Sequence, residues 1–189
     1  ANGIIATKTG SEDFLSHDNW LQFVNLAHKV GCFIWGRKTY EAVIKWEGDY
    51  LNDLKAVKKI IVSRSPIKLN EGFVLASSPE DALEQLKSEG FKEAIITGGS
   101  TLNSEFAKRG LIDEVRFDVN PAILGDGIPV FAPANFEMKL RLKKVEKDFE
   151  EFKAKHATTV SELRKALKIK PDVKKSGPLG APKGHKGYF

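Results

Sequence analysis

Two glycines and two hydroxyl side chains follow an apolar run near the middle of the chain. The run at 93–97 has the branched apolar residues of a buried strand. Residues 98–101, Gly-Gly-Ser-Thr, lead from it into a helix that Gly110 would end. Glycines let a backbone approach a ligand closely, and the start of a helix offers free N–H groups to a phosphate. The alternative for this pattern alone is a strand–helix turn that binds nothing.

Two other predicted strands end in residues that suit phosphate. The strand at 32–35 is followed by Gly36–Thr39, and the strand at 58–62 is followed by Ser63–Ser65, with Arg64 between two hydroxyls. Ligands of parallel α/β sheets lie at the carboxyl ends of the strands. Three such ends on one sheet edge suggest a dinucleotide. The chain has no strand–GxGxxG–helix unit, so an ordinary Rossmann site is not indicated.

Strands alternate with helices along the chain. This order predicts a three-layer α/β fold with a mostly parallel, twisted sheet flanked by helices. Strands are predicted at 32–35, 58–62, 73–75, 93–97, 113–119 and 138–142, and helices after a cap at Ser16 or Asp18, at 40–44, from Ser78 to Gly90, and from Leu102 to Gly110. Residues 124–131 are expected to be a glycine-rich loop.

Composition narrows the classes of protein. The lone Cys32 excludes a disulfide framework and a cysteine zinc site, and the four histidines lack ligand spacing, so we expect no metal. No apolar run approaches a membrane span and no signal pattern is present, which favours the cytoplasm. Residues 153–189 contain ten Lys and Arg and two acids, a net charge of +8. The whole chain has a net charge of +5, so residues 1–152 have a net charge of −3. The basic charge therefore belongs to the C-terminal part.

Three stretches carry a family resemblance. Residues 35–41 are Trp-Gly-Arg-Lys-Thr-Tyr-Glu, 62–65 are Val-Ser-Arg-Ser, and 96–102 are Ile-Thr-Gly-Gly-Ser-Thr-Leu. In this order they resemble the dihydrofolate reductase superfamily. The stretches 110–115 and 121–131 more closely resemble the branch that contains the reductase domain of riboflavin biosynthesis.

The resemblance covers residues 1–150 and implies an NADPH-dependent hydride transfer to a C=N-type bond of a pteridine-like or pyrimidine substrate. It also implies which residues hold the cofactor. Those that match the family's cofactor-binding positions are Ala6, Thr7, Gly36, Arg37, Lys38, Thr39, Ser63, Arg64, Ser65, Gly98, Gly99, Ser100, Thr101 and Leu102. Among them, Ser63–Ser65 match the loop that receives the adenosine 2′-phosphate.

The substrate side departs from the family's patterns. Asp18 matches the substrate-side acid of dihydrofolate reductases, and protonation of the product comes from it or from water; the alternative for Asp18 is a plain helix cap. Asn2 and Asn19 are predicted substrate-binding residues. Riboflavin-type reductases carry an arginine late in the first helix, where this chain has Lys29. Lys29 would serve as a point charge for a substrate phosphate, or it is a solvated helix end.

Both ends of the chain differ from the family. The family's first strand would precede Asn2, so we expect the natural chain to begin upstream of Ala1. Residues 151–189 are predicted to be a basic extension, with a short helix around 159–167 and then a disordered stretch. Such a tail could touch nucleic acid, although a plain solvated extension is the simpler interpretation.

The sequence therefore predicts an NADPH-dependent reductase with a small-molecule substrate, and it leaves a homodimer open. The first choice of reaction is that of a 5-amino-6-(5-phosphoribosylamino)uracil reductase, favoured by 110–131. Dihydrofolate reductase is the alternative, favoured by 36–41. A rival from another class is a non-catalytic nucleotide-binding module with an RNA-contacting tail.

Overall fold

A computed structural model describes residues 2–46, 48 and 50–145 of the chain. The chain divides into two compact units, residues 1–139 and 140–189, and the elements below belong to the first. The predicted domain boundary at 150, the short helix and the basic tail lie outside the described residues. None of the helices in the described part of the chain has the length and apolar character to cross a membrane.

Four parallel strands form the main sheet. They are β2 (Cys32–Gly36), β3 (Lys58–Val62), β4 (Phe73–Ala76) and β5 (Ile95–Ile96). Their order is β4-β3-β2-β5, so β2 lies between β3 and β5. The predicted parallel α/β sheet is confirmed.

Helices precede, follow or connect these strands. They are α1 (His17–Val30), α2 (Arg37–Val43), α3 (Pro79–Ser88) and α4 (Ser100–Lys108), with a short 3-10 helix, η1 (Tyr50–Leu54), after α2. Local sequence explains their ends. Ser78 accepts a hydrogen bond from the Asp81 amide at the start of α3, and Gly31 ends α1 with a φ of 86° that favours glycine.

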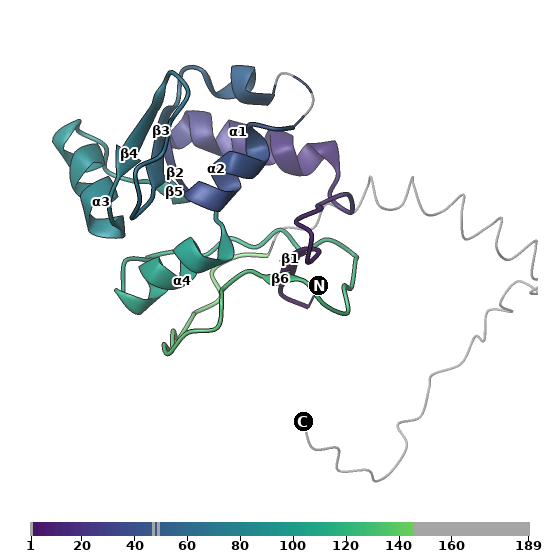
Figure 1. The fold of residues 1–189 in the computed structure, drawn as a ribbon. Coiled ribbons are helices and arrows are strands. Elements are labelled where there is room, and N and C mark those ends of the chain that lie inside the picture. Colours follow the sequence, from purple (N-terminus) through teal and green to yellow (C-terminus); the bar gives the residue numbers. More distant parts are fainter. Residues whose placement is uncertain (1, 47, 49, 146–189) are drawn as a thin grey trace, which may run out of the picture. The chain divides into compact units, whose positions relative to one another are not determined.

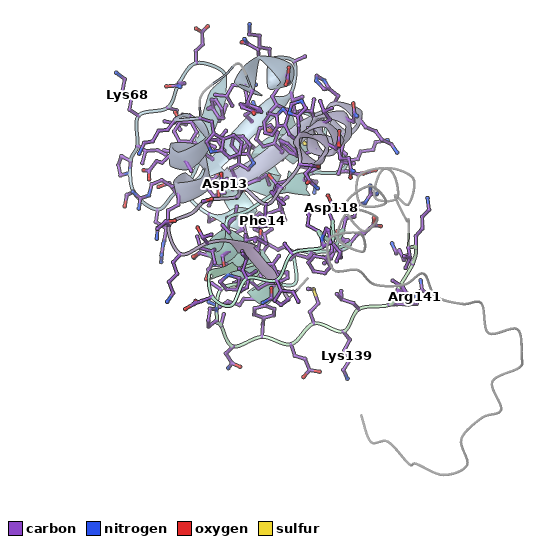
Figure 2. All side chains as sticks on the ribbon, turned by 90° about the vertical axis from the view of Figure 1, so that its right-hand side faces the viewer. Asp13, Phe14, Lys68, Asp118, Lys139 and Arg141 are labelled. Carbon is purple, nitrogen blue, oxygen red and sulfur yellow. The ribbon has the colours of Figure 1, made fainter. Side chains whose placement is uncertain are left out.

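Helices cover both faces of the sheet because the side chains of each strand alternate between the faces. Phe33 and Trp35 of β2 pack in one buried cluster with residues of α1 and α2. Cys32 and Ile34 pack in a second cluster with residues of α3 and α4. Figure 1 shows α1 and α2 on one side of the sheet and α3 on the other. Lys68, in the loop between β3 and β4, points outward (Figure 2).

A second, two-stranded sheet was not predicted. Strand β1 (Ile4–Ala6) pairs antiparallel with β6 (Ile128–Pro129), and the two lie side by side in Figure 1. The stretch predicted as a glycine-rich loop therefore contains a strand. Gly127 permits this pairing, because a Cβ there would collide with the Ala6 carbonyl oxygen and stand 2.7 Å from Ile4 Cγ2.

The strand predicted at 113–119 is absent, so that prediction was wrong. Phe117 and Val119 are 56% and 68% exposed. Alternating apolar and charged residues give a segment two faces, but a strand also needs a neighbour whose backbone pairs with its own. No sheet in the described part of the chain includes a neighbour for this segment.

The strand predicted at 138–142 is also absent. Leu140 and Leu142 are exposed. The same physical reason applies, because alternation alone supplies no partner strand for the backbone groups. This segment spans the boundary between the two compact units.

Candidate functional site

The glycine turn after β5 joins the carboxyl ends of two neighbouring strands. The Gly36 amide, at the end of β2, donates to the Gly98 carbonyl oxygen at 2.8 Å. The peptide bond between Gly98 and Gly99 is cis, and Gly98 has a φ of 107°. Thr97, just before the turn, accepts a hydrogen bond from the Trp35 indole of β2. The turn is thus fastened to β2 on both sides.

Thr39 explains why the second position of the turn is glycine. A Cβ on Gly99 would stand 3.1 Å from Thr39 Oγ1, closer than most Cβ contacts in proteins. A Cβ on Gly98 would stand 3.9 Å from the same oxygen, but its positive φ favours glycine. The first turn of α2 therefore packs directly on the glycine turn, and the structure brings Gly36–Thr39 together with Gly98 and Gly99.

Helix α4 begins at this turn with its first amides available. Its N-cap is Gly99, which has no side chain to accept hydrogen bonds from the helix start. Ser100 is 9% exposed, and its Oγ is the one buried side-chain polar atom without a hydrogen-bond partner in the described part of the chain. Thr101 is exposed and Leu102 is buried. The helix start thus offers unmet donors for an anion.

Helix α2 brings two cations to the same edge. Gly36 is its N-cap and again provides no capping side chain. Arg37 and Lys38 are both exposed. Arg37 pairs with Glu41, one turn later, at 3.3 Å.

The third strand end, after β3, lies next to the other two because Val62 pairs with Gly36 in the sheet. Ser63 Oγ donates to the Ser65 carbonyl oxygen at 2.7 Å and accepts from the Ser65 amide at 3.3 Å. The Ser63 hydroxyl therefore shapes the loop. Arg64 and Ser65 are exposed, and Arg64 makes no ion pair within the described residues.

Ala6 and Thr7 are linked to α4 through the β6 segment. Asn103 Nδ2 of α4 donates to the Val130 carbonyl oxygen, and Ser104 Oγ donates to that of Ala132, both at 2.7 Å. These bonds hold the β6 segment, which pairs with β1, where Ala6 is buried. Thr7 Oγ1 accepts a hydrogen bond from the Ser11 amide and so stabilises the local turn. The sequence analysis missed Asn103 and Ser104, because exposed-looking polar residues in a helix give no signal of a distant backbone partner.

Asp18 is not the N-cap of α1. Ser16 is the N-cap of α1, and its amide donates to Asn19 Oδ1 at 2.9 Å. Asn19 Nδ2 also donates to a carboxylate oxygen of Asp118. Asp18 stands between them in the first turn and is half-buried. Asn19 therefore stabilises the helix start. The Asp18 carboxylate, in contrast, makes no hydrogen bond within the described part of the chain.

Asn2 and Lys29 do not join the glycine turn. Asn2 Nδ2 donates to the Leu124 carbonyl oxygen at 2.6 Å, in the segment that leads to β6. Lys29 is exposed in the last turn of α1. That turn leads through Gly31 into the amino end of β2, whereas Gly36 is at its carboxyl end. The structure places Lys29 at the opposite end of the sheet from the three strand ends.

Two titratable side chains are buried near the amino ends of the strands. Lys59 Nζ donates to the carbonyl oxygens of Leu54 and Val57 at 2.8 Å, and burial lowers the pKa of its ammonium group. Cys32 Sγ donates to the Glu93 carbonyl oxygen, and burial, with the charge of Glu89, raises the pKa of its thiol to about 11. Both groups donate hydrogen bonds to backbone carbonyl oxygens and do not belong to the carboxyl edge.

The residues at the carboxyl edge fit a dinucleotide. Two helix starts without capping side chains, a buried hydroxyl without a partner, and the exposed cations Arg37, Lys38 and Arg64 suit the phosphates of such a ligand. The glycine turn lets the backbone approach it closely.

Comparisons with known proteins agree with this architecture. The model of the RibD C-terminal domain matches residues 1–154. The uncharacterized protein YwjB of Bacillus subtilis is 30% identical over 162 residues, which cover 75% of this chain and 83% of that protein. The riboflavin biosynthesis protein RibD of Corynebacterium ammoniagenes is 36% identical over 61 residues, 32% of this chain and 18% of that protein.

A solved structure of Acinetobacter baumannii RibD, form 2, has a similar fold. It superposes with a TM-score of 0.51 at 21% identity and covers 74% of this chain and 49% of that chain. This chain therefore spans about half the length of that RibD chain. The matched residues include the three strand ends and helices α1 to α4, and by its sequence and fold the chain belongs to the RibD C-terminal domain family, a branch with a dihydrofolate reductase-like fold.

Proposed function

We propose that the protein is a reductase that uses NADPH at the carboxyl edge of its sheet. The observation that carries the proposal is the meeting of three strand ends, those of the neighbouring strands β3, β2 and β5, two of which lead directly into a helix. The amides at the start of α4, with Ser100 and Thr101, would bind the pyrophosphate, and the start of α2 would bind a phosphate from the other side. When bound, the nicotinamide ring supplies a hydride.

Arg64 is the residue that selects NADPH over NADH in this proposal. Its planar guanidinium offers several donors to a phosphate, and it has no competing ion pair in the described part of the chain. The Ser63–Ser65 hydrogen bonds hold the loop on which it stands. Ala6 and Thr7 line the nicotinamide side in the same proposal.

On the substrate side, Asp18 orients a heterocycle with a C=N-type bond. Its carboxylate is half-buried, and Ser16 and Asn19 already fulfil the capping role. Protonation of the product comes from Asp18 or from water that Asp18 orients. Membership of the RibD C-terminal domain family supports a riboflavin-pathway pyrimidine as substrate. Residues 36–41 support dihydrofolate as the second choice.

The test is oxidation of NADPH by the full chain, followed by the loss of absorbance of the reduced cofactor with each candidate substrate. The panel contains 5-amino-6-(5-phosphoribosylamino)uracil, dihydrofolate and an unphosphorylated pteridine. Turnover of any member supports a reductase. A protein whose melting temperature rises with NADPH but which oxidises none of it would be a nucleotide-binding module, and the reductase proposal would be wrong.

A further inference from the structure

Thr97 joins strand β5 to the glycine turn, and the sequence pattern did not indicate it as a site residue. Its amide donates to the Ile34 carbonyl oxygen of β2 at 3.3 Å, so its backbone still follows the sheet. Its side chain is exposed. Thr97 therefore presents a hydroxyl group at the carboxyl edge of the sheet, directly before the turn that leads into α4.

The Thr97 hydroxyl accepts a hydrogen bond from a buried donor. Trp35 Nε1 of β2 donates to Thr97 Oγ1. Trp35 is only 2% exposed, and its ring packs among the rings of Phe23, Phe33 and Phe73. An indole N–H can only donate, and in the described part of the chain Thr97 Oγ1 is its acceptor. The packed indole therefore fixes one hydrogen bond of the Thr97 hydroxyl.

This bond determines what the Thr97 hydroxyl can offer to a ligand. A hydroxyl has one O–H donor and two acceptor lone pairs, and the indole occupies one of these lone pairs. The O–H hydrogen points away from the indole N–H and meets no acceptor among the described residues. A hydroxyl that already accepts a hydrogen bond is also a stronger donor, because linked hydrogen bonds polarise one another. Thr97 is thus prepared to donate to an acceptor atom at the carboxyl edge.

The Thr97 hydroxyl lies on the face of the sheet that α1 covers. Side chains alternate along β5, where Ile95 packs against the cluster that contains Trp35, and Ile96 packs against the other cluster. Thr97 comes next and bonds to Trp35, so its side chain belongs to the first face. Helix α1, which carries Asp18, packs on this face, whereas α4 packs in the other cluster. Thr97 is therefore on the side of the sheet that is proposed for the substrate.

We propose that Thr97 donates a hydrogen bond to a ring carbonyl oxygen of the substrate, and that Trp35 orients the Thr97 hydroxyl for this contact. The substrate class is thus an oxo-substituted heterocycle, with an acceptor and not an amino group beside Thr97. Both substrates proposed above carry ring carbonyl groups. The inference rests on the proposed function in assigning this carbonyl to the substrate. The donor role of Thr97 follows from its hydrogen bond with Trp35.

The test compares two ligands that differ at one position of the pteridine ring. Pterin has a carbonyl oxygen at position 4, and 2,4-diaminopteridine has an amino group there. Each ligand is titrated by calorimetry, at neutral pH, into the full chain of the wild type, Thr97→Val and Thr97→Ser. Valine keeps the branched shape of threonine without the hydroxyl. Serine keeps the hydroxyl and serves as the conservative control.

Thr97→Val is expected to weaken pterin binding about threefold to tenfold, which is the effect of losing one neutral hydrogen bond. Its affinity for 2,4-diaminopteridine should change little, and Thr97→Ser should bind pterin nearly as well as the wild type. A purely structural role of Thr97 would weaken the binding of both ligands alike. Equal losses for the two ligands, unchanged pterin affinity in Thr97→Val, or no pterin binding by the wild type would each overturn the proposal.

Trp35→Phe tests the orienting role and leaves Thr97 in place. Phenylalanine cannot donate to Thr97 Oγ1, so the hydroxyl becomes free to rotate and to accept a hydrogen bond from an amino group. This variant should therefore bind 2,4-diaminopteridine more tightly, relative to pterin, than the wild type does. In Thr97→Val the indole N–H resonance of Trp35 should move, because the indole loses its acceptor. An unchanged ligand preference in Trp35→Phe, or an unmoved Trp35 resonance in Thr97→Val, would contradict the orienting role.

A parallel measurement of NADPH oxidation separates this inference from the proposed reductase function. If the wild type oxidises NADPH but the Thr97 variants treat the two pteridines alike, the assignment of Thr97 fails and the reductase stands. If the preference for pterin depends on Thr97 and no candidate substrate supports NADPH oxidation, the reductase proposal fails. Thr97 then remains the contact of an oxo-substituted ligand.

Discussion

Neighbouring residues at the carboxyl edge of the sheet differ in whether their side chains make hydrogen bonds within the protein. The Ser63 hydroxyl is engaged with Ser65 inside its own loop, whereas Arg64 between them is exposed. Asn19 is engaged in capping α1 and in contact with Asp118, whereas Asp18 beside it is not the cap. The side chains with a structural partner hold the backbone, whereas the hydrogen bonds and ion pairs of the described residues leave Arg64 and Asp18 without one, as the proposed ligand roles require.

Arg64→Ala is expected to lower affinity for NADPH and to change affinity for NADH little. A charge-assisted hydrogen bond to a phosphate is worth about 1.5–3 kcal/mol, so the loss should be about tenfold to a hundredfold. Lys68→Ala is the control, since Lys68 is an exposed cation in the same β3–β4 connection and points outward (Figure 2). Dissociation constants for both cofactors measure the effect. Equal losses for NADPH and NADH would mean that Arg64 supports the loop and does not read the 2′-phosphate.

Asp18→Asn is expected to reduce turnover much more than stability. Because Ser16 is the helix cap, the substitution removes a charge from the first turn of α1 without removing the cap. Loss of a group that orients or donates a proton costs about a hundredfold in rate, whereas a charge near a helix start contributes about 0.3–1 kcal/mol. Turnover and melting temperature measure the two effects separately. Unchanged turnover would contradict the role of Asp18 at the substrate.

Cys32 is expected to resist alkylation in the folded protein at mildly alkaline pH and to react once the chain is unfolded. Burial, with the charge of Glu89, raises the pKa of its thiol to about 11 from an ordinary 9.0, so the folded protein holds a proton that the unfolded chain loses. Stability should therefore fall as the pH rises through 9.0 toward 11. Mass spectrometry after iodoacetamide treatment checks the reactivity. Rapid native labelling would show that the thiol is accessible.

At the scale of elements, α4 connects the two sheets. Its first residue lies at the glycine turn of the main sheet, and Asn103 and Ser104 hold the segment that contains β6. Strand β6 in turn pairs with β1, which carries Ala6. Side chain–backbone bonds of this kind join residues more than twenty positions apart. Sequence patterns report local periodicity, so neither β6 nor its attachment could be predicted.

Gly127→Ala is expected to break the pairing of β1 with β6 and to destabilise the protein by about 1–3 kcal/mol, the usual cost of forcing extra atoms into a packed site. The new Cβ would collide with the Ala6 carbonyl oxygen. Gly125→Ala is the control, because a Cβ at Gly125 meets no atom within 4 Å. Denaturant unfolding compares the two. A Gly127 variant as stable as the Gly125 variant would contradict the close approach of β1 and β6.

At the scale of the whole molecule, the sequence predicted the main sheet and failed on the segments outside it. Strand β2 and the second half of β3 are short apolar runs followed by turn residues, and the burial of their side chains favours a strand inside a parallel sheet. Residues 113–119 alternate as a strand would, but pairing depends on which neighbour is available, and periodicity does not contain that information.

The candidate site was partly predictable for the same reason. Glycines and hydroxyls directly after buried strands predict the edge of the sheet where ligands bind. In the structure Gly36, Ser63 and Gly98 lie at the ends of adjacent strands. The packing of Trp46 and Tyr50 could not be predicted, because both rings contact Trp20 of α1, which is distant from them in the sequence.

The central claim is that the start of α4 binds the phosphates of NADPH, and Thr101 tests it most directly. Thr101 is exposed in the first turn of α4, and in the described part of the chain its side chain makes no hydrogen bond. An aspartate there suits the helix start and so preserves the fold, but its charge repels a phosphate. Asparagine has nearly the same shape without the charge, and it serves as the control.

The measurement is the NADPH dissociation constant of the wild type, Thr101→Asp and Thr101→Asn, with melting temperatures recorded in parallel. The account predicts that the wild type and Thr101→Asn bind NADPH, and that Thr101→Asp loses affinity about tenfold or more while melting no lower than the wild type. Equal NADPH affinity in all three proteins, or no binding by the wild type, would contradict the account.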